Sequence, residues 1–142
     1  MAEPPVIHSD LELFLTAWYR AELAARPEPV CADVFVDRVE STKTPAPRRQ
    51  LIVRDDGIVQ TSFLTGRASI GLTVLAGTKA NPKDAKDLGR IVLALASQIA
   101  SPDPTNPIAR LATATGPYLV AEQSTFARAY IPVTFDVVGR AL

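Results

Sequence analysis

The residue types that carry out most protein chemistry are scarce in this chain. His8 is the only histidine, and it precedes the first expected helix, within residues 1–8, which we expect to be flexible. A metal site built on His8 and Cys31 would need further ligands, and the sequence places none beside them. We therefore interpret His8 as a solvated or capping side chain.

Cys31 is the single cysteine, which excludes an intrachain disulfide. A nucleophilic thiol needs a neighbouring base or a positive environment, and the sequence offers only His8 at an unknown separation. Cys31 follows Pro29 and Val30 and precedes an expected strand. We interpret it as a small buried apolar residue.

Two further patterns suggest chemistry but are typical of turns. Asp55-Asp56 is followed by Gly57, a turn signal, and two carboxylates alone are too few ligands for a hard cation. Gly77-Thr78-Lys79 matches only the end of a phosphate-binding loop, because the earlier glycine is missing. Ser–His–Asp catalysis would depend on His8. We therefore predict no catalytic residue, no metal site and no cofactor.

The composition is typical of one globular domain spanning residues 1–142. The hydrophobic share is 47%, and 15 basic residues balance 15 acidic ones. This zero net charge argues against nucleic acid or an anionic membrane as the main partner. No run approaches the roughly 18 apolar residues of a membrane span, and Met1–His8 lacks the features of a signal peptide. We expect a soluble protein that is made in a cytoplasm.

The clearest structural pattern lies between Arg67 and Ile99. Residues 70–74 alternate apolar with small or polar side chains, as in a half-buried strand. Asn81-Pro82 predicts the start of a helix, with Asn81 as N-cap and Pro82 at the first helical position. One apolar stripe at helical spacing follows: Leu88, Ile91, Val92, Leu95 and Ile99.

A second amphipathic helix is expected near the start of the chain. Ser9 and Glu12 form an S-x-x-E capping box, which predicts that the helix begins at Ser9. Arg26-Pro27 predicts its end. The expected apolar face consists of Leu11, Phe14, Leu15, Trp18 and Ala25, widened by Ala21. Arg20 and Glu22 lie off this face.

The remaining segments read as strands and loops. The expected strands are 33–39, 50–54, 67–75, 118–123 and 128–138. Residues 58–65 either extend a strand or form an exposed loop. Pro132 lacks an N–H group, which predicts an edge position or a bulge in the last strand. The order is therefore α-β-β-β-α-β-β, an α+β fold with a mostly antiparallel sheet packed by two amphipathic helices.

Two helices can cover one face of such a sheet, which leaves the other face or the edges for a partner. Residues 41–49 are too long for a tight hairpin and predict a projecting loop that either reaches a neighbouring subunit or is simply solvated. Arginine outnumbers lysine, a bias typical of interfaces and also of GC-rich coding. The candidate subunit-interface residues are Thr42, Lys43, Arg48, Arg49, Phe63 and Arg67.

From about Ser9 to Arg140, the chain resembles the tail terminator family of long-tailed (siphovirus-type) bacteriophages. Three segments carry the resemblance: the opening amphipathic helix at 10–15, the strand at 67–74 running into the helix at 85–99, and the closing strand at 130–137. The bias towards alanine, arginine and proline is similar to that of a phage with a GC-rich host.

The resemblance implies a non-enzymatic virion protein at the head-proximal end of the tail, assembled in the host cytoplasm. Such proteins form a ring, usually of six subunits, that caps the tail tube, stops its polymerisation and joins the tail to the head connector. The implied partners are further copies of the chain, the tail tube protein and a head-completion or stopper protein, with DNA able to pass through the ring lumen. Alternatives are another head–tail junction protein, such as a stopper or adaptor, or a small cytoplasmic binding module or enzyme.

Overall fold

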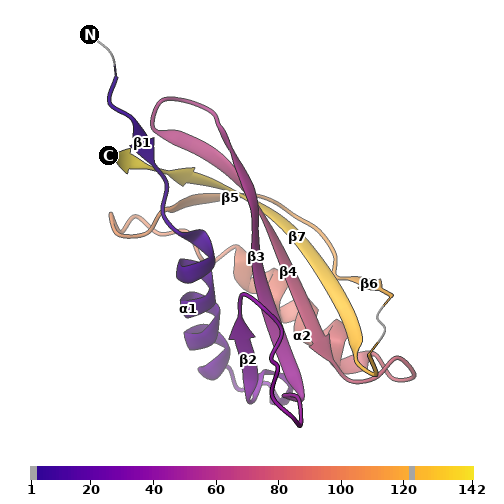
Figure 1. The fold of residues 1–142 in the computed structure, drawn as a ribbon. Helices are drawn as coiled ribbons and strands as arrows, with labels where there is room; N and C mark the ends of the chain where they lie inside the picture. The colour runs from indigo at the N-terminus through magenta and orange to yellow at the C-terminus, as the bar shows by residue number, and fades with distance from the viewer. Residues whose placement is uncertain (1–2, 122–123) are drawn as a thin grey trace.

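A six-stranded sheet with both long helices on one face forms the centre of the computed structural model, which describes residues 3–121 and 124–142 (Figure 1). The helices are α1 (Leu11–Ala24), the 3-10 helix η1 (Pro29–Cys31) and α2 (Lys83–Ala96). The strands are β1 (Val6–Ile7), β2 (Val34–Asp37), β3 (Arg49–Gln60), β4 (Thr65–Ala76), β5 (Ile108–Ala114), β6 (Tyr118–Val120), β7 (Ala127–Val138) and β8 (Arg140–Ala141). The predicted α+β class is confirmed.

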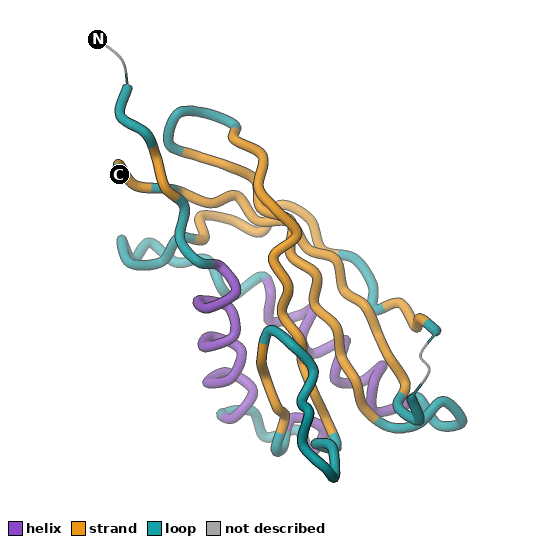
Figure 2. Tube along the Cα trace, viewed as in Figure 1, coloured by secondary structure: helices purple, strands orange, loops and turns teal. Residues whose placement is uncertain are grey.

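The strand order in the main sheet is β2-β3-β4-β7-β5, and β6 also pairs with β7. Only β2 and β3 pair in parallel. The long strands β3 and β4 form an antiparallel hairpin that extends beyond the helices (Figure 2). The short strands β1 and β8 form a separate two-stranded sheet near both chain ends.

Both helices cover the same face of the sheet. Helix α1 packs on β2 and β3, and α2 packs on β4 and β7. The buried hydroxyl of Tyr19 in α1 donates to the carbonyl of Val92 in α2 at 2.9 Å, which joins the two helices. The strand residues beneath them are buried and apolar: Leu51, Val53, Ile70, Leu72, Val74, Ile131, Val133 and Phe135. We call the other side of the sheet the open face; it includes Arg54, Arg67, Arg110, Tyr130, Thr134 and Asp136.

The first helix differs from the prediction at its start and on its buried face. Its N-cap is Asp10, whose carboxylate accepts from Leu13 N at 3.0 Å, so the Ser9–Glu12 capping box was wrong. Glu12 instead accepts from Asp55 N at 2.9 Å. The buried face is Leu11, Leu15, Tyr19 and Leu23. Phe14 and Trp18 are only partly buried and pack at the border of this face. The four residues of the buried face follow i, i+4 spacing and form a single row along the helix.

The second helix begins one residue later than predicted. Pro82 occupies the cap position, and no side chain caps the helix, so the expected N-cap role of Asn81 was wrong. Pro82 O accepts the first helical bond, from Lys86 N at 3.1 Å. The predicted apolar stripe is confirmed, because Leu88, Val92 and Leu95 are buried with Ile99, which follows the helix end.

The expected turn at Asp55–Gly57 is a bulge within β3. The register with β4 shifts between Asp55 and Ile58, and Gly57 has a φ of +111°, which favours glycine. Asp55 Oδ1 accepts from Gly57 N at 2.9 Å. Residues 58–60 therefore extend the strand, and the exposed turn of the hairpin is confined to 61–64.

The last strand is central in the sheet, so the predicted edge position of Pro132 was wrong. Pro132 pairs with Gly71 of β4, and its carbonyl accepts from Thr115 N at 3.2 Å. Since a strand residue points its N and its carbonyl to the same side, the missing N–H faces the break between β5 and β6. β5 was not predicted. The expected strand at 118–123 is confirmed over 118–120 as β6; Ala121 lies outside the strand, and residues 122–123 lie outside the described residues.

The expected flexible N-terminus and the expected projecting loop are both partly held by contacts within the chain. Val6–Ile7 of the expected flexible N-terminus pair with Arg140–Ala141, while residues 1–2 lie outside the described residues. Residues 41–49 include the first residue of β3. The loop start is held where Ser41 N donates to Gln50 Oε1 at 2.9 Å and where Glu40 pairs with Arg128. Residues 42–46 are exposed.

Candidate subunit interface

The residues first considered for chemistry do not gather into a reactive site. Among the described residues, no group of three or more His, Cys, Asp or Glu side chains is placed to hold a metal ion. Cys31 is buried, and this burial raises the pKa of its thiol, which disfavours the reactive thiolate. Asp55 and Asp56 have separate partners, because Asp56 pairs with Arg54 at 2.6 Å. In the part of the chain that the structure describes, no helix is long and apolar enough to cross a membrane.

The open face carries a ladder of polar side chains in place of a helix. Asp136 in β7 accepts from Arg67 in β4 at 2.9 Å and from Arg110 in β5 at 2.7 Å. The hydrogen bonds from Arg67 and from Arg110 lower the pKa of the Asp136 carboxyl. Along the same face, the Thr113 and Thr134 hydroxyls lie 2.6 Å apart. These charges and hydroxyls make this face suited to water rather than to a buried apolar contact.

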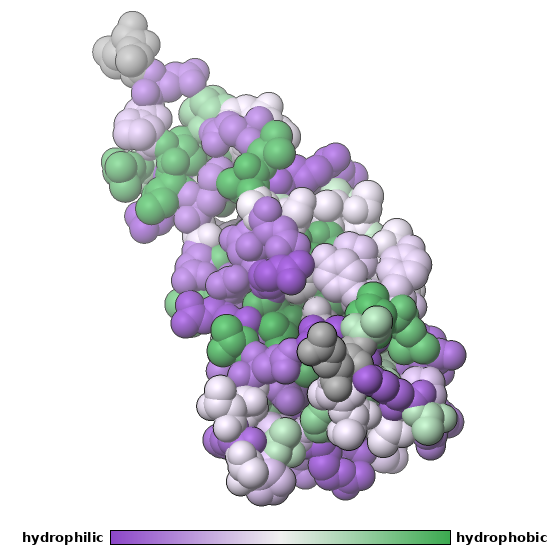
Figure 3. All heavy atoms as spheres, turned by 45° about the vertical axis from the view of Figure 1, so that its right-hand side comes forward, coloured by the Kyte–Doolittle hydropathy of each residue, from purple (hydrophilic) through white to green (hydrophobic). Residues whose placement is uncertain are grey.

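Most large exposed apolar side chains instead gather at one end of the molecule. We define the hairpin-end patch as the six of the eleven in the described residues that lie there: Ile7, Ile58, Val59, Phe63, Val138 and Leu142. The segments carrying them are joined by backbone bonds from Gly139 N to Leu64 O at 2.8 Å and from Leu142 N to Pro5 O at 2.9 Å. Figure 3 shows apolar atoms gathered at this upper end. Because consecutive strand residues such as Ile58 and Val59 point to opposite faces, apolar side chains are exposed on both sides of this end. Exposed apolar clusters are typical of protein interaction sites.

Two smaller apolar surfaces lie at opposite lateral edges of the sheet. The outer side of α1 carries Leu13 and Ala17 exposed beside Phe14 and Trp18. At the other edge, all three residues of β6 are exposed, and Figure 3 shows apolar atoms on this side too. β6 pairs with β7 on one side.

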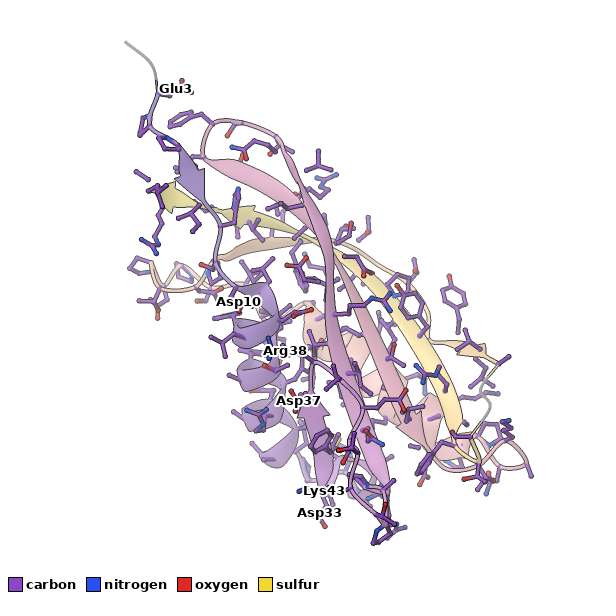
Figure 4. All side chains as sticks on the ribbon, in the orientation of Figure 1. Glu3, Asp10, Asp33, Asp37, Arg38 and Lys43 are labelled. Carbon is purple, nitrogen blue, oxygen red and sulfur yellow. The ribbon has the colours of Figure 1, made fainter. Side chains whose placement is uncertain are left out.

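The structure separates the six predicted interface residues. Thr42, Lys43 and Arg48 are exposed in the β2–β3 loop, at the end of the molecule away from the hairpin; Lys43 is labelled there in Figure 4. Phe63 lies in the hairpin turn at the opposite end and is 55% exposed. Arg67 lies on the open face, paired with Asp136.

Arg49 has partners within its own chain. Its Nη1 donates to Ala32 O at 3.0 Å, and its Nη2 lies 3.8 Å from the Asp84 carboxylate. Its side chain is largely buried. The expected pairing of Arg49 with a neighbouring subunit is therefore in competition with these contacts, whereas Arg48 is exposed.

Sequence reasoning missed most of the exposed apolar residues that the structure reveals. Leu13 reads as part of an amphipathic helix, and Leu119 as part of an ordinary strand. One usable signal existed for Leu13, because it lies off the i, i+4 row of Leu11, Leu15 and Tyr19. No protein-family model matches the chain, and no curated protein matches it.

Proposed function

We propose that this chain is a structural virion protein, a tail terminator whose copies form a ring on the head-proximal end of a phage tail tube. The hairpin-end patch is the observation that carries the proposal. It exposes six large apolar side chains at one end of the sheet, four of them in the strands β1, β3 and β7, one in the hairpin turn and one after β8. An exposed patch of this kind is stabilised by burial against another protein.

The sequence resemblance supplies the kind of assembly. The three segments that carry the resemblance correspond to α1, to β4 followed by α2, and to β7. In the proposed ring, the hairpin-end patch is the surface that contacts another component of the tail. This role requires no catalytic activity of the chain. The proposed partners are further copies, the tail tube protein and the head-completion protein.

Solution mass tests this proposal directly. Native mass spectrometry and light scattering of the full chain, alone and mixed with assembled tail tubes, should give either a closed ring or a monomer that becomes a ring on tube ends. Tubes grown in its presence should be capped and shorter. A tight dimer holding a small ligand, with no effect on tubes, would contradict the proposal.

The variant Phe63→Ser tests the patch itself. Because Phe63 is 55% exposed, its loss should change the free energy of unfolding by less than about 0.5 kcal/mol. We expect the variant to bind tube ends more weakly in a sedimentation assay. Val39→Ser is the matched control, since Val39 is 67% exposed but lies outside the patch. Equal binding by the two variants would remove the patch from the contact.

A further inference from the structure

The outer side of α1 presents an apolar strip that no other element of the described residues covers. We define the α1 strip as Leu13, Phe14, Ala17 and Trp18, which line one shallow groove. Their spacing places 13 above 17 and 14 above 18, in two rows along the helix. Leu13 is 66% exposed. The Trp18 ring is held edge-on to the Tyr19 ring at 5.1 Å, so its position is fixed by the core.

A second apolar strip lies at the far edge of the sheet. We define the β6 strip as Tyr118, Leu119, Val120 and Phe126. The three β6 side chains are exposed, and Leu119, Val120 and Phe126 line one groove together with Lys79. β6 pairs with β7 and lies at the edge of the sheet, so its exposed apolar side chains face outward from the subunit.

The sheet order sets the two strips on opposite sides of one subunit. Helix α1 packs over β2 and β3, whereas β6 joins the sheet beyond β7 (Figure 1). A closed ring of identically oriented subunits needs two different surfaces that face opposite ways and fit each other. A contact between like surfaces would give a dimer instead.

The charges bordering the two strips are opposite in sign. Asp10 lines the groove of the α1 strip and lies at the first turn of the helix (Figure 4). Lys79 lines the groove of the β6 strip. A carboxylate on one apolar surface and an ammonium on the other favour one pairing between copies and disfavour each strip meeting itself.

We infer that the α1 strip of one copy packs against the β6 strip of the next. The occupant of each strip is therefore a second copy of this chain. This inference rests on the proposed function, because it names the lateral contact of the proposed ring. The hairpin-end patch stays free in this arrangement for a different component.

Two single variants, studied apart and together, test the inference. Leu13→Arg places a charge in the α1 strip alone, and Leu119→Arg places a charge in the β6 strip alone. Both positions are exposed, so both variants should keep the circular dichroism spectrum and unfolding midpoint of the wild type. Each alone should associate at least about tenfold more weakly than the wild type and remain monomeric where the wild type forms rings.

Mixing the variants gives the decisive result. The intact β6 strip of Leu13→Arg can meet the intact α1 strip of Leu119→Arg, so an equimolar mixture should form a one-to-one dimer and nothing larger. Native mass spectrometry resolves this species because the two variants can carry different isotope labels. Val39→Arg serves as the control, since Val39 is 67% exposed and lies outside both strips and the hairpin-end patch, and it should leave the rings assembled.

The outcomes separate this inference from the proposed function. Rings that persist in both variants, or variants that do not combine on mixing, would overturn the α1–β6 contact while leaving the ring itself in place. A wild-type chain that assembles neither alone nor on tail tubes would overturn the proposed function, and the contact with it. Lys79→Glu replaces the ammonium group beside the β6 strip with a carboxylate. It should weaken assembly, and the loss should be larger at low salt than at high salt, because salt screens the charges.

Discussion

At the residue scale, Tyr19 joins the two helices through a single polar atom. Its ring is fully buried, and its hydroxyl donates to Val92 O across the interface between α1 and α2. Burial raises the pKa of this phenol well above its ordinary value of about 10. The buried hydroxyl of Tyr19 keeps its hydrogen bond only while both helices stay packed on the sheet.

Tyr19→Phe should lower the free energy of unfolding by about 1 kcal/mol at neutral pH, the usual value of one hydrogen bond. The pH dependence has a definite sign. Because the folded pKa is raised, the contribution of Tyr19 is fully present below about pH 10 and is lost as the unfolded phenol ionises above it. Urea unfolding at pH 7 and about pH 11 should show the wild-type advantage shrinking. An advantage that grows with pH would contradict burial of this phenol.

Asp136 provides the opposite pH dependence. Arg67 and Arg110 lower the pKa of its carboxyl, so its contribution to stability is present above the unfolded pKa of about 3.9 and is lost as the pH falls through the lower, folded value. Asp136→Asn should therefore be less stable than the wild type at pH 7, and the difference should disappear in acid. Glu3→Gln is a control at an exposed site away from the sheet. Thermal unfolding across the acid range measures both variants.

At the element scale, the helix starts show where local sequence signals are ambiguous. Ser9 and Asp10 are both good N-cap residues, and a capping box favours Ser9. The structure uses Asp10, whose carboxylate accepts from Leu13 N, while the Glu12 carboxylate that a capping box requires accepts from Asp55 N of the β3 bulge instead. A contact with a distant strand therefore removes one half of the capping box.

Substituting each cap candidate in turn tests this choice. Asp10→Ala should lower the free energy of unfolding by about 1 kcal/mol, because Leu13 N loses its acceptor. Ser9→Ala is the matched control and should change it by less than about 0.5 kcal/mol. Urea unfolding of the two variants gives both values. A larger loss in Ser9→Ala would restore the capping box as the true start of the helix.

The strands differ in how clearly the sequence predicts them. In β4 from Ala68 to Val74 and in β7 from Val133 to Val137, apolar residues alternate with small or polar ones, and both strands were predicted close to their observed bounds. In β5, the register with β7 shifts twice, between Ile108 and Arg110 and between Leu111 and Thr113. Each shift breaks the two-residue period that identifies a strand in a sequence. This strand was missed for that reason.

At the scale of the whole molecule, apolar side chains cover one face of the sheet and polar side chains cover much of the other, on which Leu75 is also buried. Phe135 and Thr134 are neighbours in β7 and point to opposite sides. Phe135 is fully buried beneath the helices, whereas the Thr134 hydroxyl pairs with that of Thr113 on the open face. The apolar burial that stabilises the fold is therefore concentrated in a single layer.

The two neighbours should respond very differently to truncation. Phe135→Ala should lower the free energy of unfolding by about 3–5 kcal/mol, and Thr134→Ala by less than about 1 kcal/mol. Denaturant unfolding of both variants at equal protein concentration checks this contrast. A loss in Thr134→Ala as large as that in Phe135→Ala would show that a second layer covers the open face in solution.

The sequence by itself determined the fold class, both helices, the strands β4 and β7 and the buried stripe of α2, whereas β3 was predicted only over residues 50–54. Each of these depends on neighbouring residues, whose spacing sets which side chains share a face. Tertiary structure decided the caps, the bulge at Gly57, the central place of Pro132 and the gathering of Ile7, Phe63 and Leu142 at one end. Those features depend on which distant segments meet, and a residue's neighbours along the chain carry no record of strand order or register.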